Sequence, residues 1–159
     1  MRWRGSSYPK ELIWPTNCSL SAGGKRRRNS VARVVLDSSA LLAFINGEPG
    51  REKVAIRLPE AIISAVNYAE VVSKLIAKGG TPAQVTAILD VIDIEIVAFD
   101  QSQATTAGNL IHQTKDFGLS LGDRACLALA LHDSSSAMTT DKIWEKAAHG
   151  TGIIVELAR

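Results

Sequence analysis

The sequence has little cysteine. Its 159 residues include only Cys18 and Cys126, and neither has a second Cys or a His nearby at metal-ligand spacing. This excludes a disulfide framework and a zinc site built from a local motif. Cys126 stands in the apolar run Ala-Cys-Leu-Ala-Leu-Ala, so we predict a buried structural thiol and not a nucleophile.

Long hydrophobic runs are also missing. No apolar run reaches the length of a membrane span, so we expect no membrane association. Asp37 interrupts the apolar residues that follow the basic N-terminal segment, which argues against a secretion signal and for a cytoplasmic protein. The chain also lacks a glycine-rich phosphate loop and a dinucleotide fingerprint, so a nucleotide cofactor is not expected.

Positive charge is scarce outside the N-terminal segment. The formal net charge is +2, but residues 1–30 hold seven Lys or Arg and one Glu, a local charge of +6, so the remainder carries −4. An acidic body argues against broad attraction to nucleic acid and fits carboxylates gathered around a cation. Any contact with RNA must therefore be local.

The chain divides into a leader and one domain. Residues 1–30 are rich in Ser, Gly, Arg and Lys without helical or strand periodicity, so we interpret them as a flexible basic leader. Bacterial translation can begin at a valine codon, and Val31 directly precedes the first expected strand. One hypothesis is therefore that the start is assigned too far upstream, which the intact mass of the natural protein would test. Residues 31–159 have the length of a single domain.

Short β-branched runs alternate with amphipathic or alanine-rich segments from Val31 onward, which predicts an α/β fold with a parallel sheet covered by helices. Strands are expected at residues 33–36, 61–64, 95–99, 137–140 and 153–157. Helices are expected at residues 39–46, 51–58, 67–78, 82–93, 101–115, 122–132 and 142–147.

Acidic residues stand where the ligand crevice of such a sheet would lie, beyond the carboxyl ends of the strands. Asp37 and Asp141 each directly follow an expected strand, and Glu70 lies near the start of a helix between apolar neighbours. Asp123 begins another helix. Taken alone, each of these acids has a simpler interpretation. Asp123 could be an ordinary acid in the first turn of a helix, and Asp37 and Asp141 could each cap a helix.

Together, the four acids indicate a site for a hard cation. Carboxylates gathered without Lys or Arg repel one another unless a cation is bound. Mg²⁺ and Mn²⁺ suit an oxygen-only site, where a bound ion activates water and stabilises a leaving oxygen during phosphodiester cleavage. The sequence leaves open whether one ion or two are bound.

Four segments carry a resemblance to the PIN-domain family, specifically to VapC-like toxins. They are residues 34–43 (VVLDSSALLA), 63–71 (ISAVNYAEV), 119–128 (LSLGDRACLA) and 139–144 (TTDKIW). The resemblance extends from about Arg33 to the C-terminus and does not cover the leader, which such toxins ordinarily lack.

The resemblance implies a three-layer α/β/α sandwich with a central parallel sheet and a Mg²⁺- or Mn²⁺-dependent endoribonuclease. It also implies the toxin role in a type II toxin–antitoxin pair, a VapB-like antitoxin that occupies the active-site groove, and a homodimer. The matching metal-binding acids are Asp37, Glu70, Asp123 and Asp141. Supporting positions are the hydroxyl residues Ser38 and Thr139, together with Asn67, which is either a site residue or a structural amide.

Three other interpretations were weighed. A catalytically inert module that binds RNA or a partner is disfavoured by the complete set of four acids, and a housekeeping RNA-processing nuclease stays open. Phosphatases with an aspartyl nucleophile carry a second Asp two residues after the first, where this chain has Ser39. We expect Trp144 to pack in the core and not to stack on bases.

Overall fold

Five parallel strands form the centre of the molecule. The structure, a computed structural model, describes residues 33–159, so the expected leader at residues 1–30 lies outside the described part. The strand order is β3-β2-β1-β4-β5 and every pairing is parallel. The strands are β1 (Val34–Leu36), β2 (Ala61–Ser64), β3 (Glu95–Val97), β4 (Ser136–Thr139) and β5 (Val155–Leu157).

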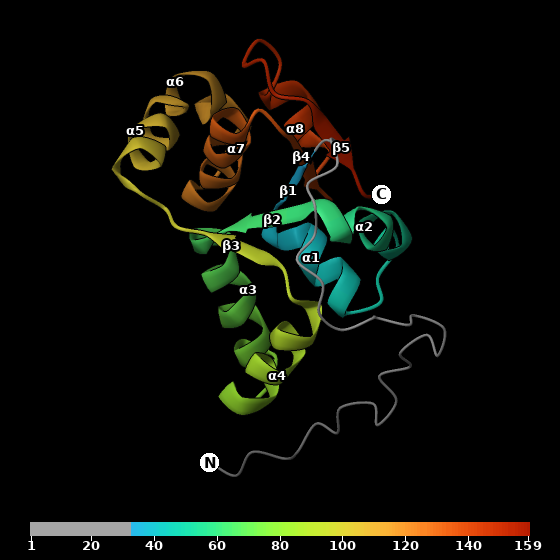
Figure 1. Ribbon diagram of the computed structural model, residues 1–159. Coiled ribbons are helices and arrows are strands. Elements are labelled where there is room, and N and C mark those ends of the chain that lie inside the picture. The colour runs from blue at the N-terminus through green and yellow to red at the C-terminus, as the bar shows by residue number, and fades with distance from the viewer. Residues whose placement is uncertain (1–32) are drawn as a thin grey trace, which may run out of the picture.

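Helices cover both faces of this sheet (Figure 1). On one face lie α1 (Ser38–Ile45), α2 (Arg51–Arg57), α3 (Ala65–Ala77) and α4 (Pro82–Ile92). On the other lie α5 (Gln101–Asn109), α6 (Ile111–Thr114), α7 (Leu121–Asp133) and α8 (Ile143–Ala147). Two 3₁₀ turns, Leu58–Glu60 and Lys115–Phe117, complete the described elements. The predicted α/β/α sandwich with a central parallel sheet is confirmed.

The strand pleat divides the apolar residues between two cores. Val34 and Leu36 point toward the face covered by α1 and α3, whereas Val35 points toward α7. The alanine-rich helix α7 is buried from Ala125 to Ala130, and its small side chains let it pack closely on the sheet. Cys126 and Trp144 are 0% and 1% exposed, which confirms that both are core residues.

One expected helix is interrupted. Residues 101–115 were predicted to form a single helix, but the structure ends α5 at Asn109 and begins α6 at Ile111. The break follows Gly108 and Asn109, which are weak helix formers. Gly118, at a φ of +70°, ends the 3₁₀ turn that follows α6, as its position in the sequence predicts.

The strand order places a crossover at the centre of the sheet. From β1 the chain builds outward through β2 and β3, and then returns to the opposite side of β1 to form β4 and β5. Ligands of open α/β sheets bind at such a switch point, beyond the carboxyl ends of the two central strands. Within residues 33–159, no helix is both long and apolar enough to cross a lipid bilayer.

Candidate functional site

Asp37 occupies the switch point. It directly follows β1, and its backbone N–H donates to the carbonyl of Met138 in β4 at 2.9 Å. It is also the N-cap of α1, because its Oδ2 accepts the backbone N–H of Ser39 at 3.1 Å. Only 3% of the residue is exposed, so this carboxylate is buried at the junction of two strands and a helix.

Asn67 fixes the other oxygen of that carboxylate. Its Nδ2 donates to Asp37 Oδ1 at 3.1 Å and to the carbonyl of Gly122 at 3.1 Å. Asn67 is fully buried in the first turn of α3, so this single amide connects the end of β1 with the start of α7. These contacts make Asn67 a structural amide, and they place it directly against Asp37.

Hydroxyl groups complete the surroundings of Asp37. Thr139 Oγ1 donates to Asp37 Oδ2 at 3.2 Å, and Ser38 Oγ lies 3.5 Å from Asp37 Oδ1. The shorter contact comes from Ser39, whose Oγ donates to Asp37 Oδ2 at 2.5 Å and accepts the backbone N–H of Thr140 at 3.1 Å. The sequence analysis did not include Ser39 among the site residues, although an Asp followed two residues later by Ser is typical of a helix cap.

Glu70 lies at the contact between α3 and α7. A Cβ atom built on Gly122 would lie 2.9 Å from Glu70 Oε2, so this carboxylate rests against the residue before Asp123. The other oxygen, Oε1, forms an ion pair with Lys74 Nζ at 2.6 Å, one turn further along α3. The expectation that no Lys or Arg compensates the acids is therefore wrong, because helical i,i+4 spacing brings Lys74 onto the face of Glu70.

Asp123 is part of a capping box. Its Oδ2 accepts the backbone N–H of Ser120 at 2.7 Å, and its own N–H donates to Ser120 Oγ at 3.2 Å. This arrangement begins α7 at Leu121, one residue earlier than predicted. Arg124 does not pair with these acids, because its guanidinium donates to the carbonyls of Ala107 and Leu119.

Asp141 is connected to the site through Thr139. The backbone N–H of Asp141 donates to Thr139 Oγ1 at 3.2 Å, while its Oδ1 accepts the N–H of Ile143 at 3.0 Å. The residue is exposed. Its carboxylate therefore closes a short turn just before α8. The N-cap of that helix is Lys142, so Asp141 is not the helix cap that the second interpretation of the sequence expected.

The electrostatics single out Asp37. Burial raises the pKa of its carboxyl above the ordinary value, and the nearby charge of Asp123 raises it further, while hydrogen bonds from Ser39 oppose the shift. Burial also raises the pKa of the Cys126 thiol well above its ordinary value, and the charges of Asp37 and Asp123 add to the effect. Cys126 is therefore an inert thiol beneath the site.

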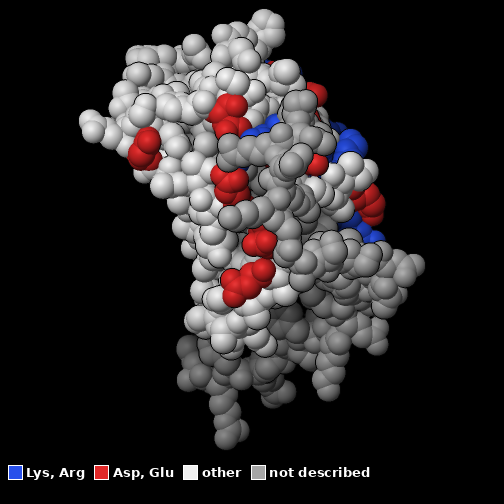
Figure 2. Space-filling model, in the orientation of Figure 1, with Lys and Arg blue, Asp and Glu red and all other residues white. Residues whose placement is uncertain are grey.

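The described residues carry few cations near these acids. On the face of the molecule seen in Figure 2, Asp and Glu side chains are scattered over the surface, and Lys and Arg side chains lie mainly toward the top and the right of the view. Within residues 33–159, the hydrogen bonds to the Asp37 carboxylate come only from neutral donors, and no donor reaches the buried Oδ1 of Asn67. A buried carboxylate without a cation beside an unpartnered amide oxygen is a donor set that suits a hard divalent ion.

The acids do not converge on one point. No three His, Cys, Asp or Glu side chains among the described residues are placed to hold a metal ion together. The reason is local: the outer acids, as we call Glu70, Asp123 and Asp141, each direct a carboxylate oxygen to a partner in their own segment. The residue types fit the cation, although in this arrangement the three outer acids do not gather with Asp37.

Comparison with known structures supports the fold. A toxin–antitoxin complex from Klebsiella pneumoniae matches with 18% identity and a TM-score of 0.62 over 79% of this chain and 98% of that one. DNA-bound VapBC from Salmonella typhimurium matches with 17% identity and a TM-score of 0.63 over 81% and 100%. VapBC-5 from Mycobacterium tuberculosis matches with 23% identity and a TM-score of 0.53 over 81% and 99%.

The sequence itself identifies the family. The chain matches none of the curated proteins with which it was compared. Residues 34–150, however, match the family described as the PIN domain, and this range includes Asp37 and the three outer acids. Since the match covers most of the chain, and the fold is similar to that of the solved structures above, this protein belongs to the PIN domain family.

Proposed function

We propose that this protein is a Mg²⁺- or Mn²⁺-dependent endoribonuclease that hydrolyses phosphodiester bonds of RNA. The observation that carries the proposal is the Asp37 carboxylate, which is 3% exposed at the switch point of the sheet and accepts hydrogen bonds from neutral donors. Burying a charge in this way is costly unless a cation or a proton compensates it. Membership of the PIN domain family supports the cation.

Asp37 and the outer acids would hold the metal, which when bound activates a water molecule and stabilises the leaving oxygen of the phosphodiester. Asn67, Ser39 and Thr139 keep the Asp37 carboxylate in a single orientation by their hydrogen bonds. Asn67 also holds the carbonyl of Gly122, so it sets the distance between Asp37 and the start of α7, where Asp123 lies. This chain therefore supplies a fixed carboxylate and three adjustable ones.

The biological part of the proposal is a toxin of a bacterial type II toxin–antitoxin pair, active in the cytoplasm. Its support is that the similar structures from Klebsiella and Salmonella are a toxin–antitoxin complex and a DNA-bound VapBC. A VapB-like antitoxin that covers the acids would be the partner, and a homodimer would be the working form. Co-purification of this chain with the product of an adjacent small gene would test the pairing.

The deciding experiment is RNA cleavage by purified protein. A mixed RNA pool is incubated with Mg²⁺ or Mn²⁺, with EDTA, and with an Asp37→Asn variant. The matched control is Asp90→Asn, which removes an exposed carboxylate of α4 that lies outside the site. A single-stranded DNA pool of the same length tests whether the activity is specific for RNA.

We expect metal-dependent cleavage of RNA that EDTA and Asp37→Asn abolish and Asp90→Asn leaves intact. Asp37→Asn should remain folded. The surroundings raise the pKa of the Asp37 carboxyl, which means that they disfavour its charged form, and the substitution removes that charge. Binding of Mn²⁺ and RNA without cleavage would identify a catalytically inert module instead. Cleavage with no toxicity on expression would favour a housekeeping nuclease.

A further inference from the structure

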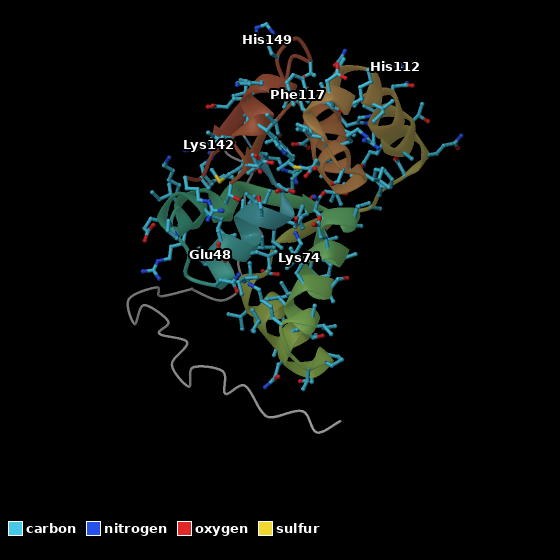
Figure 3. The ribbon with its side chains drawn as sticks, turned by 180° about the vertical axis from the view of Figure 1, so that it is seen from behind. Glu48, Lys74, His112, Phe117, Lys142 and His149 are labelled. Carbon is cyan, nitrogen blue, oxygen red and sulfur yellow. The ribbon has the colours of Figure 1, made fainter. Side chains whose placement is uncertain are left out.

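Lys74 is placed at the edge of the acid site. It lies one turn after Glu70 on α3, and its Nζ is 2.6 Å from Glu70 Oε1. Figure 3 labels Lys74 near the middle of the molecule, and α3, which carries it, contacts both α1 and α7. The side chain is 49% exposed, so the ammonium group faces both Glu70 and solvent.

The position of Lys74 is unusual among the cations of the described part of the chain. In residues 33–159, the ion pairs of Arg33, Arg51, Arg57 and Arg159 are with acids that lie outside the site. The guanidinium of Arg124 donates hydrogen bonds to two backbone carbonyls. Of the ion pairs in this part of the protein, only that of Lys74 includes one of the four acids.

A polyanionic substrate needs such a cation. Residues 33–159 carry a net charge of −4, and the site itself holds four acids, so an RNA backbone that approaches it meets repulsion. Affinity for RNA comes largely from Lys and Arg that neutralise individual phosphates. A backbone phosphate next to the acids therefore needs a positively charged side chain nearby. Lys74 is such a side chain, because it pairs directly with Glu70, one of the four acids.

The chemistry of the lysine allows the contact without loss of the ion pair. An ammonium group has three N–H donors, and Glu70 Oε1 occupies one direction. An exposed i,i+4 pair also holds its partners only weakly, so Lys74 can shift toward a phosphate at little cost. We propose that Lys74 binds a backbone phosphate of the RNA beside the acid site; the RNA in this statement rests on the function proposed above.

The test measures RNA binding and not cleavage. Fluorescence anisotropy of labelled oligouridylate and oligoadenylate is recorded in EDTA from about 50 to about 200 mM KCl. The proteins are the unaltered chain, Lys74→Gln, Lys74→Arg and Lys53→Gln. Lys53 is the control, because it is an exposed lysine of α2 that donates to the carbonyl of Leu157 in β5.

Loss of one phosphate contact should make the negative slope of log K against log salt shallower, with a magnitude smaller by about 0.7 for a single strand. We expect this change for Lys74→Gln, equally with both oligonucleotides, and recovery of most of the slope in Lys74→Arg. Lys53→Gln should keep the slope of the unaltered protein. Equal slopes for Lys74→Gln and Lys53→Gln would overturn the assignment, as would a loss limited to one base sequence.

The outcomes separate this inference from the proposed function. Metal-dependent cleavage together with an unchanged slope in Lys74→Gln would remove the role of Lys74 and leave the ribonuclease. A shallower slope for Lys74→Gln, when the unaltered protein cleaves no RNA, would keep the phosphate contact and remove the ribonuclease. No binding of either oligonucleotide by the unaltered protein at low salt would overturn the assignment of Lys74.

Discussion

The acids of this site are held in two different ways. Asp37 is buried and fixed by partners from three separate segments: Ser39 in α1, Asn67 in α3 and Thr139 in β4. The outer acids Glu70, Asp123 and Asp141 are at least partly exposed, and each is held by a partner within four residues in the sequence.

This difference has an energetic consequence. The surroundings of Asp37 form only when the whole domain folds, so a change there should cost stability as well as activity. The outer acids rely on one capping box, one turn hydrogen bond and one ion pair, each of which contributes about 1 kcal/mol. A cation can exchange those local partners without unfolding anything, which makes the outer acids the adjustable half of the site.

The largest expected effect is that of Asn67→Ala. The substitution leaves Asp37 Oδ1 and the carbonyl of Gly122 without their shared donor and removes volume from a fully buried position. We expect the free energy of unfolding to fall by about 2–4 kcal/mol and cleavage to be lost. Urea denaturation and the RNA cleavage assay measure the two effects.

The matched control for Asn67→Ala is Gln103→Ala. Gln103 is also a buried amide, 5% exposed, and it donates from Nε2 to the carbonyl of Ala98, away from the acids. The Gln103→Ala variant should have a lower free energy of unfolding and should cleave RNA at the rate of the unaltered protein. A stability loss for Asn67→Ala that is no larger than about 0.5 kcal/mol would contradict the view that Asp37 is fixed by the fold.

Glu70→Gln tests the adjustable half. Because the ion pair that Glu70 makes within residues 33–159 is a partly exposed i,i+4 contact, the free energy of unfolding should change by less than about 0.5 kcal/mol. Loss of a carboxylate from the cation site should still lower cleavage by about a hundredfold or more. Glu52→Gln, which breaks the exposed pair with Arg51 on α2, should change neither quantity. Full activity of Glu70→Gln would exclude Glu70 from the site.

The sequence predicted the frame of this site better than its details. Residues at the carboxyl ends of β1 and β4 lie at the switch point in a parallel sheet of this order, so Asp37 could be located from its strand position alone. Thr139, the last residue of β4, was expected only from the resemblance to the PIN-domain family. The short spacing of Lys74 from Glu70 and of Ser120 from Asp123 was also visible in the sequence. Their pairing was not predicted, because an acid at such a position suits a cation site and a local partner equally well.

Other contacts could not be predicted from spacing. Asn67 reaches both Asp37 and Gly122, which are 30 and 55 residues away in the sequence, and this depends on how closely α3 and α7 approach. The approach in turn depends on Gly122, where Glu70 Oε2 takes the space that a side chain would fill. In the sequence, a single glycine in the first turn of a helix does not indicate that another helix packs closely against it.

Gly122→Ala offers the smallest and most selective test of the comparison. The new Cβ would lie 2.9 Å from Glu70 Oε2, so the flexible carboxylate must move while the backbone stays in place. We expect cleavage to fall about tenfold, in the range seen when the surroundings of metal ligands are altered. The free energy of unfolding should stay the same or rise by up to about 1 kcal/mol, because alanine favours the helix.

Gly108→Ala provides the control for Gly122→Ala, since it makes the same exchange inside α5 with nothing within 4 Å of the new Cβ. It should gain stability and cleave RNA like the unaltered protein. If both variants cleave equally well, the position of the Glu70 carboxylate is not critical and the outer acids are freer than the structure suggests. If Gly122→Ala alone loses activity while remaining fully folded, the adjustable half of the site still requires one defined place for Glu70, and the close contact of α3 with α7 is what sets it.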